Sequence, residues 1–506
     1  MNVTTPPAPA AEPAVFAAAP LDALFRRNAA AHPTAIALVD PPDRATFTDG
    51  NPRELTYAEA ELAVRKLARR LRSLGLPRDS VVATALPNTV EATISLLAIL
   101  RAGYVAAPVP VLWGRADLVR ALDPINAKAL ITLARLGDDR PAEVACAAAA
   151  ELFSLSFPCA FGRQVPDGAV PLDLDQLGSE AGLEAEEAPA SDPDAIAIVT
   201  FDAAARGPFA VARNHREWTA AGFATLVAAA IEPGDTIVTS LPPATLAGIG
   251  GAFVPWLLSG GSLRLLSGAA SEVFASVERK THLLAPAASL VGSEVTVVGS
   301  CIAVHRAPVT LGIDFSTLAA QSVVDLAVFG EIGALAVRRA TPERASPLPL
   351  GAVAAPHARE GTPALIETRA ADGYLSLGGA MVPRRLYPPV LLNARLNAPR
   401  LEANKEGFVR TGFRARAEGD VLVVDSAPAD VAAIGALRFG LDDLTSRVTA
   451  AAGDAAVYVI YDPLLGGRLL IEADDPPAAA SALEQAGCSR LLVEAVTRRA
   501  QQRAAG

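Results

Sequence analysis

The chain has 506 residues, of which 51% are hydrophobic, 19% charged and 5% aromatic. This apolar content excludes disorder for most of the chain, and the length predicts about three compact units, or one large and one small domain. The formal net charge of −10 argues against a nucleic-acid partner, because such a partner requires a basic face.

Membrane and secretory signals are not recognised in the sequence. No apolar stretch approaches the ~18 to 20 residues that cross a bilayer, and no basic segment followed by an apolar core indicates a signal peptide. The four Cys are widely separated, which favours neither a disulfide framework nor a zinc site. We therefore expect a reduced, cytoplasmic protein without a membrane partner.

The first third of the chain alternates between helix and strand signals. Residues 1–18 are rich in Ala and Pro and predict a disordered arm. Helical periodicity begins near Leu21, and a second helix begins at Thr56, where Glu59 completes a capping box, and ends at Gly75. A strand, a helix and a strand are then predicted over 81–86, 91–101 and 105–109. This alternation predicts an α/β layer with a parallel sheet.

The same alternation continues in the middle of the chain. Strands are predicted over 195–200, 236–240 and 262–266, and an apolar helix over 249–258. A loop is expected after Thr200, leading to a helix from Arg216.

The pattern changes after Pro347. Shorter alternating strands over 364–368, 374–377 and 421–424 predict a β-rich subdomain. A small α+β domain follows, with helix, strand, strand and helix over 441–448, 456–460, 468–472 and 478–485. The turn residues at 425–428 indicate the boundary between the large domain and this small domain. The expected organisation is an arm over 1–18, a large N-terminal domain over 19–425 and a short C-terminal lid domain over 426–506.

Four segments resemble those of one superfamily. They are RELTYAEAELAVRKLARRLRSLGLPRDSVVATALPNTVEATISLLAILRAGYVAAPV at 53–109, WLLSGGSLRLL at 256–266, RTG at 410–412 and YDPLLGG at 461–467. In this order and spacing the chain resembles the adenylate-forming superfamily of acyl-CoA synthetases, nonribosomal adenylation domains and luciferases.

The resemblance implies a fold and a reaction. It implies a multi-layered N-terminal domain, with parallel sheets and flanking helices, that binds ATP and an acid, and a small C-terminal domain that moves between two half-reactions. ATP and Mg²⁺ would activate a small carboxylic acid as the acyl-adenylate, and coenzyme A or another thiol would accept the acyl group. A fold alone does not carry this function, so each site is considered by its residues.

The phosphate-binding loop of the superfamily is rich in Ser, Thr and Gly and ends in Pro-Lys-Gly, because phosphates need N–H groups, hydroxyls and a cation. The corresponding residues 200–215 read TFDAAARGPFAVARNH. Thr200 keeps one hydroxyl, Asp202 adds a negative charge and Phe209 replaces the Lys. Either Arg206 substitutes for the Lys and the loop binds ATP, or this degenerate loop is a connector without that task, which we favour.

The acid pocket of the superfamily corresponds to LPPATLAG at 241–248. Thr245 stands where the superfamily usually has a His, and Gly248 is expected in the same pocket. A Thr hydroxyl can bind a ligand, but an ordinary loop Thr explains the residue equally well.

The adenine-binding motif Tyr-Gly-x-Thr-Glu corresponds to VVDLAVFGEIG at 323–333. Phe329 and Gly330 match its first two positions, so the resemblance implies that the Phe329 ring stacks on adenine. Glu331 follows directly, two residues early and without the Thr. Either a re-routed loop brings Glu331 to Mg²⁺, or it is a solvated loop residue, which we favour.

The ribose-binding motif corresponds to EGFVRTGFRAR at 406–416. Arg410 and Thr411 match its start and are expected near the nucleotide, but Phe413 replaces the Asp that would hold the ribose hydroxyls. A buried hydroxyl left without a partner costs about 1–3 kcal/mol. The Arg of the following hinge motif is also missing, although Asp425 remains as a flexing point.

The C-terminal catalytic Lys of the superfamily has no counterpart, because the last of the four Lys is Lys405. Arg cannot replace a compact ammonium group, and the arginines near the chain end, Arg498, Arg499 and Arg503, read as exposed helix residues.

The missing groups favour a non-catalytic or weakly active protein. Loss of one transition-state donor typically lowers a rate by about 10² to 10³, and several such groups are absent. We therefore predict an acyl-CoA synthetase-like pseudoenzyme with eroded ATP motifs, which binds an acyl or aromatic acid or a protein partner and needs no cofactor. The alternatives are an active acid–CoA ligase that uses ATP/AMP, Mg²⁺ and coenzyme A through unusual contacts, and a protein that performs the thioester-forming half alone.

Overall fold

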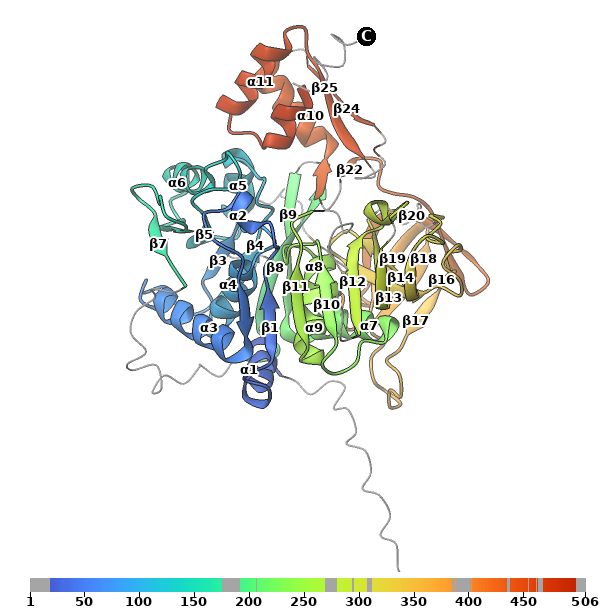
Figure 1. The fold of residues 1–506 in the computed structure, drawn as a ribbon. Helices are drawn as coiled ribbons and strands as arrows, with labels where there is room; N and C mark the ends of the chain where they lie inside the picture. The colour runs from blue at the N-terminus through green and yellow to red at the C-terminus, as the bar shows by residue number, and fades with distance from the viewer. Residues whose placement is uncertain are drawn as a thin grey trace, which may run out of the picture.

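The computed structural model describes most of the chain (Figure 1). The described residues are 19–174, 192–205, 207–268, 280–293, 295–306, 312–384, 387, 401, 403–434, 437–453, 455–460, 462 and 467–496. The predicted arm over 1–18, Arg206, most of the YDPLLGG segment and the three C-terminal arginines lie outside them.

The first sheet has seven strands in the order β7-β6-β5-β3-β4-β8-β9. Their bounds are β3 Val81–Thr84, β4 Val105–Pro108, β5 Ala129–Leu133, β6 Phe157–Phe161, β7 Val170–Leu172, β8 Ile196–Ala204 and β9 Gly207–Asn214. All neighbours are parallel except β8 and β9. Every residue of β3, β4 and β5 is buried, as expected for parallel strands that are covered on both faces.

The second sheet has eight strands in the order β15-β14-β13-β12-β10-β11-β1-β2. Their bounds are β1 Ile36–Val39, β2 Glu54–Thr56, β10 Thr236–Thr239, β11 Ser262–Leu265, β12 Thr281–Pro286, β13 Thr296–His305, β14 Ala319–Phe329 and β15 Gly333–Arg338. The six inner strands are parallel, and both edge strands are antiparallel to their neighbours. The carboxyl ends of β13 and β14 therefore lie at the same edge of this sheet.

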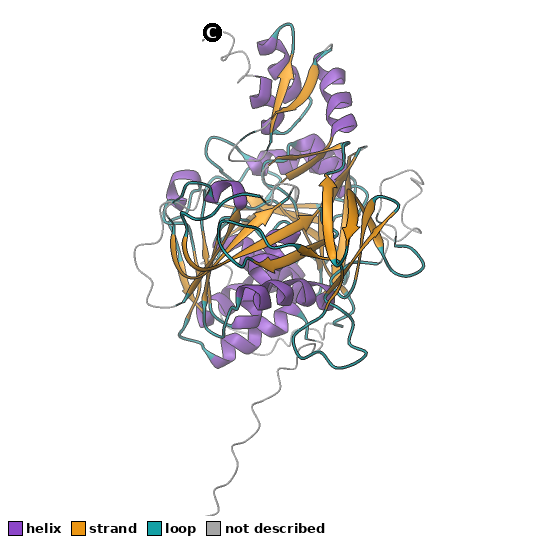
Figure 2. Ribbon diagram, turned by 90° about the vertical axis from the view of Figure 1, so that its right-hand side faces the viewer, coloured by secondary structure: helices purple, strands orange, loops and turns teal. Residues whose placement is uncertain are grey.

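The helices pack against these sheets. Their bounds are α1 Leu21–Ala31, α2 Arg44–Phe47, α3 Tyr57–Arg72, α4 Val90–Arg101, α5 Arg115–Leu122, α6 Pro141–Glu151, α7 His215–Ala229, α8 Leu246–Gly248, the π-helix Ile249–Phe253 and α9 Val254–Ser259. Residues of α1, α3, α4, α7 and α9 share one core with both sheets, and Figure 2 shows helices between the strands. Helices α5 and α6 cover the other face of the seven-stranded sheet. Among the described residues, no helix is long and apolar enough to cross a bilayer.

The third sheet is entirely antiparallel and confirms the predicted β-rich subdomain. Its order is β16-β21-β20-β19-β18-β17, with bounds β16 Leu348–Pro349, β17 Gly351–Val353, β18 Ile366–Ala371, β19 Tyr374–Gly378, β20 Val409–Glu418 and β21 Val421–Ser426. The mixed α/β architecture with parallel sheets and flanking helices is thus as predicted.

The last part of the chain has a core of its own and lies above the rest in Figure 1. Its elements are β22 Val431–Ile434, β23 Leu437–Gly440, α10 Leu441–Ala452, β24 Ala456–Ile460, β25 Arg468–Glu472 and α11 Pro476–Gln485. The predicted order of helix, strand, strand and helix is confirmed for the four elements from α10 to α11.

Two local predictions had different outcomes. The capping box at the start of α3 is confirmed, since Thr56 Oγ1 accepts the Glu59 N–H and the Glu59 carboxylate accepts the Thr56 N–H. The predicted loop after Thr200 is wrong, because β8 continues to Ala204 and pairs with β9 as an antiparallel hairpin. Without the Gly and Ser residues that favour a loop, this segment has side chains that pack as cross-strand pairs.

Candidate functional site

The β8–β9 hairpin places the predicted site residue Thr200 and its neighbour Asp202 on one of its faces. Thr200 lies opposite Val211 and Asp202 lies opposite Phe209, and residues two apart in a strand share a face. Both Thr200 and Asp202 are buried, and the Thr200 hydroxyl has no hydrogen-bond partner. A packed hairpin therefore occupies the segment that the resemblance aligns with the phosphate-binding loop of the superfamily.

The Asp202 carboxylate is bonded from three directions. It accepts the N–H of Glu331 at 2.8 Å and that of Ala203 at 2.7 Å. It also pairs with the guanidinium of Arg438, which lies on β23 in the C-terminal part of the chain. The charge that would oppose a triphosphate is thus neutralised by the protein's own arginine.

The turn after β14 fits closely against Asp202. Gly330 has a left-handed φ of 64°, and a Cβ at this position would lie 2.1 Å from Asp202 Oδ2. A glycine is required here both by the backbone conformation and by the approach of the carboxylate. This turn leads from Phe329 to Glu331 and holds both beside the hairpin.

The Phe329 ring is packed inside the protein. It is 0% exposed and meets the ring of Phe413 edge-on, with centroids 5.3 Å apart and an interplanar angle of 87°. The Arg438 guanidinium lies 5.7 Å from the Phe413 centroid. The structure thus packs Phe329 and Phe413, which the resemblance assigned to the adenine and ribose motifs, as an aromatic pair.

Glu331 is buried, with 2% of its surface exposed, so the interpretation as a solvated loop residue is wrong. Its Oε2 accepts the N–H of Leu246 at 2.6 Å, and its Oε1 lies 3.9 Å from Nη1 of Arg306. Burial raises the pKa of this carboxyl to about 7, and the charge of Asp202 acts in the same direction, whereas Arg306 opposes both. The Glu331 carboxyl group therefore titrates near neutral pH.

Thr245 and Gly248, the residues predicted for an acid pocket, belong to the same segment as Leu246, whose N–H donates to Glu331. The Thr245 hydroxyl caps α8 by accepting the Gly248 N–H at 3.4 Å, and it accepts a hydrogen bond of 2.9 Å from Nη2 of Arg306. Burial lowers the pKa of Arg306. The cluster therefore combines a buried cation, a hydroxyl and a buried carboxyl.

Arg213 is a buried residue of this cluster that the sequence did not identify. Its Nη2 donates to the carbonyl of Ile332 at 2.8 Å and its Nε to that of Met381 at 3.0 Å, and its guanidinium lies 5.0 Å from the Trp218 ring. Burial lowers its pKa to about 10. The sequence feature that could have identified Arg213 is a single Arg within the mostly apolar run of β9.

Arg306 and Arg438 were missed as well. The run from Cys301 to Val304 is apolar and ends in His-Arg, which is typical of the carboxyl end of a parallel strand, where ligands often bind. Arg438 gave no local signal, since its partner Asp202 is 236 residues away in the sequence.

The two remaining predicted residues lie on β20. The Thr411 hydroxyl donates to the carbonyl of Leu375 at 3.0 Å and accepts the N–H of Phe413 at 3.2 Å. Arg410 is exposed and stacks on Tyr374, with its guanidinium 3.5 Å from the ring centroid. Thr411 therefore supports the aromatic pair from its own strand, while Arg410 stacks on Tyr374 at the exposed face.

The arrangement does not fit Mg²⁺. Among the described residues, no three His, Cys, Asp or Glu side chains are placed to hold a metal ion. Asp202 and Glu331 both accept N–H groups and face arginines, and a metal needs their oxygens free. Adenine stacking on Phe329 likewise needs a face of the ring that is accessible.

The C-terminal part packs directly on the tip of the hairpin. The N–H of Asp443 donates to the carbonyl of Ala205 at 2.9 Å, and the Asp443 carboxylate pairs with Arg120. Arg447 pairs with Asp117 in the same contact region. Together with Arg438, these contacts hold the C-terminal part against the seven-stranded sheet.

The comparison of the chain with known families concerns its fold and its family. The AMP-binding enzyme family matches residues 25–286, which is more than half of the chain. The chain therefore belongs to the AMP-binding enzyme family.

Two curated relatives are similar over short segments. Glycine betaine reductase ATRR of Emericella nidulans is 43% identical over 83 residues, which are 16% of this chain and 6% of that protein. The beauvericin nonribosomal cyclodepsipeptide synthetase of Gibberella fujikuroi is 29% identical over 194 residues, 38% of this chain and 5% of that protein. The chain thus spans a small fraction of the length of either.

Two solved structures are similar over nearly the whole chain. Apo MbtA from Mycobacterium smegmatis has a TM-score of 0.62 and 18% identity, covering 94% of this chain and 90% of its own. The o-succinylbenzoate CoA synthetase MenE from Bacillus subtilis has a TM-score of 0.65 and 14% identity, with coverages of 94% and 93%. These likenesses show that the chain has the fold of adenylate-forming enzymes.

Proposed function

We propose that this chain is an acyl-CoA synthetase-like member of its family that forms acyl-adenylates weakly or not at all and binds an acyl or aromatic carboxylic acid, or a protein partner. The observation that carries the proposal is that the residues aligned with the superfamily's nucleotide-binding motifs contact one another and other residues of this chain. Asp202 is bonded to Arg438 and Glu331, and Phe329 is packed on Phe413. A nucleotide would have to displace these contacts before it gained its own.

The energetic cost of this displacement supports a non-catalytic role. Separation of the buried pair Asp202–Arg438 leaves two charges to be solvated or paired again, and loss of one partner of such a pair typically costs about 3–5 kcal/mol. Loss of the Phe413 ring from its contact with Phe329 adds to this cost. An ATP site would also need cations for the phosphates in addition to those that already pair with Asp202.

Acid binding is supported by the other half of the cluster. Arg306 is a cation at the carboxyl end of β13 that already donates to the Thr245 hydroxyl. Its contact with Glu331 at 3.9 Å is longer than a hydrogen bond. A ligand carboxylate that binds Arg306 while Glu331 is protonated would form a charge-assisted hydrogen bond.

The division of the chain into 19–425 and 426–506 belongs to the same proposal. A separate core in the C-terminal part supports it, as does the change of sheet between β21 and β22. In the role proposed here, the C-terminal part stays on the hairpin instead of moving between half-reactions.

The test is a pyrophosphate-release assay with ATP, Mg²⁺ and a panel of short, aromatic and long-chain acids. We expect no acid-dependent release, together with binding of at least one class of acid in calorimetry without ATP. Arg306→Gln should abolish that binding, whereas Arg410→Gln, which removes an exposed cation outside the cluster, should leave it unchanged. Acid-dependent release at about 1 s⁻¹ or faster, the usual range for enzymes, would refute the proposal.

An active acid–CoA ligase is the second candidate. It is favoured by the three arginines that converge on Asp202 and Glu331, namely Arg213, Arg306 and Arg438, since these cations can stabilise phosphate charge. This function would require Arg438 to exchange Asp202 for a phosphate group, and the same assay detects it.

A further inference from the structure

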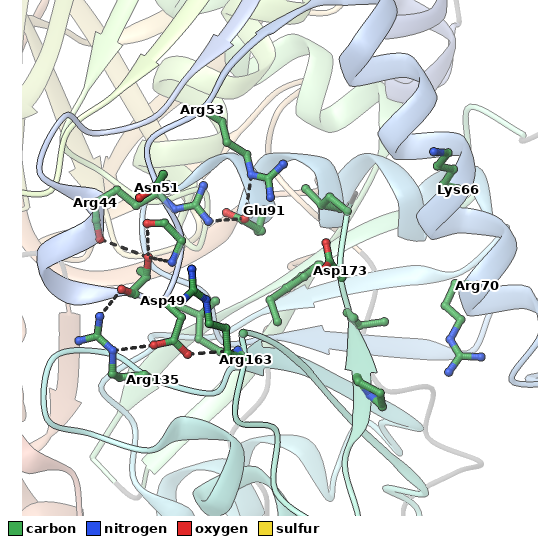
Figure 3. A pocket seen from close by; sticks show the side chains of 18 of the residues that line it. Arg44, Asp49, Asn51, Arg53, Lys66, Arg70, Glu91, Arg135, Arg163 and Asp173 are labelled. Carbon is green, nitrogen blue, oxygen red and sulfur yellow. Dashed lines mark hydrogen bonds and ion pairs between the residues drawn. The ribbon is translucent and has the colours of Figure 1, made fainter. Parts of the chain in front are cut away.

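A second region of the molecule has the features of a binding site. A cavity of about 1070 Å³ lies between α3, the loop over 48–53 and the strands β5 to β7, within the described residues (Figure 3). Seven Arg and Lys side chains line it, against three Asp and Glu. An excess of four positive charges in one concavity is unexpected for a chain whose net charge is −10.

On one side of the cavity the acidic side chains are already paired. Glu91 is bonded to Arg44 at 2.5 Å and lies 3.8 Å from Arg53. Asp49 accepts a hydrogen bond of 2.8 Å from Nε of Arg135 and one of 3.3 Å from the N–H of Arg163. These two carboxylates therefore do not neutralise the helix on the opposite side.

Helix α3 forms that opposite side. Lys66 and Arg70 are four residues apart and so lie on one face of the helix, while Val64, Leu67 and Leu71 are buried in the core. Figure 3 shows Lys66 and Arg70 on the helix, across the cavity from Asp49 and Arg163. Within the described residues, no hydrogen bond or ion pair joins Lys66 or Arg70 to a carboxylate. Two like charges at this spacing repel each other unless an anion lies between or beside them.

We propose that this cavity binds a small organic polyanion that carries at least two phosphate groups, held by Lys66 and Arg70 on one side and by Arg163 on the other. Its volume is slightly larger than the ~300–1,000 Å³ typical of small-molecule sites, so a molecule of nucleotide size fits. The planar guanidinium groups suit phosphate oxygens, and Lys supplies a point charge.

The observations favour a small molecule over a polymer or a membrane. The positive charges face a concavity, whereas a nucleic acid or a lipid surface needs an extended basic face. The strongly negative net charge of the chain would repel both at longer range. A compact polyanion places its charges where the excess of positive charge is concentrated.

The site is tested by calorimetry on the full chain, with ATP free of Mg²⁺, pyrophosphate, orthophosphate and citrate as probes. We expect binding of one ATP or pyrophosphate per chain, weaker binding of orthophosphate and citrate, and a loss of affinity as salt increases. Lys66→Gln/Arg70→Gln should weaken pyrophosphate binding by about tenfold or more, because two charge-assisted contacts are lost.

A matched double variant distinguishes a site from general charge effects. Arg65→Gln/Arg78→Gln removes two positive charges on and just after the same helix, and neither residue lines the cavity. It should leave the affinity within about twofold of the wild type, because charges outside the cavity are screened by solvent. Arg163→Gln, at an exposed position, tests the opposite wall if the helix variant does not fold.

Three results would overturn the proposal. They are no binding of ATP or pyrophosphate at millimolar concentration, an equal loss of affinity in both double variants, and binding that is unaffected by Lys66→Gln/Arg70→Gln and by Arg163→Gln. The pyrophosphate-release assay of the preceding subsection does not depend on these outcomes, so the two proposals can fail separately.

Discussion

Replacement of Asp202 by Asn tests whether the internal pairing of the cluster has a structural role. Asn keeps an oxygen that can accept the Glu331 N–H, so the main loss is the charge facing Arg438. Both side chains of the pair are less than a tenth exposed, and an uncompensated buried charge typically costs about 3–5 kcal/mol. We expect Asp202→Asn to lower the free energy of unfolding by an amount in that range.

The double variant Asp202→Asn/Arg438→Met separates the pair from other effects. The double variant should lose less stability than the two single variants together, with a coupling energy of about 0.5–3 kcal/mol in a double-mutant cycle. Urea unfolding measures the free energies, and hydrogen exchange should show faster opening of Leu441–Ala452 in the single variant, because this helix follows the strand that carries Arg438. Additive losses, or a loss below about 1 kcal/mol in Asp202→Asn, would refute the reasoning.

Three further predictions concern the same cluster. Burial raises the pKa of Glu331 from 4.5 to about 7, so the folded state keeps this proton and its stability falls as pH rises from about 4.5 to about 7. Glu331→Gln should remove this part of the pH dependence. Urea midpoints measured below and above this pH interval provide the test. Gly330→Ala should cost at least about 1–2 kcal/mol from the left-handed backbone alone, with a further loss from the contact with Asp202, and a change in midpoint too small to measure would contradict the geometry. Phe413→Ala should cost about 3–5 kcal/mol in unfolding experiments, and a neutral result would mean that the ring does not pack on Phe329.

The fold was largely predictable because its signals are local. The capping box at Thr56 and Glu59 fixed the start of α3, and the short alternating strands indicated the β-rich subdomain. The strands between Thr281 and Arg338 were not predicted, because they are long buried runs without the alternation that marks a half-exposed strand.

The candidate site was predictable only in part. The resemblance identified Thr245, Phe329 and Glu331. The structure places Thr245 and Glu331 around Arg306 and Leu246, and Phe329 at the start of the turn that leads to Glu331. Their partners Arg306 and Arg438 come from distant elements, and the register that joins them depends on tertiary packing. Only the spacing of Lys66 and Arg70 along α3 could have indicated the cationic cavity, since its other walls are assembled from separate segments.

The contact between the hairpin and Arg438 has a consequence for how this chain can change. A Lys introduced at position 209 would face Asp202 across the hairpin and compete with Arg438 for the same carboxylate. Removal of Asp202 alone would leave the buried charge of Arg438 without its partner, and removal of Arg438 alone would do the same to Asp202. Single substitutions at Asp202 or Arg438 that introduce residues typical of the superfamily are therefore expected to lower the stability of the protein. The hairpin thus forms a contact between two distant parts of the chain, and loss of this contact without loss of stability requires coordinated changes at Asp202 and Arg438.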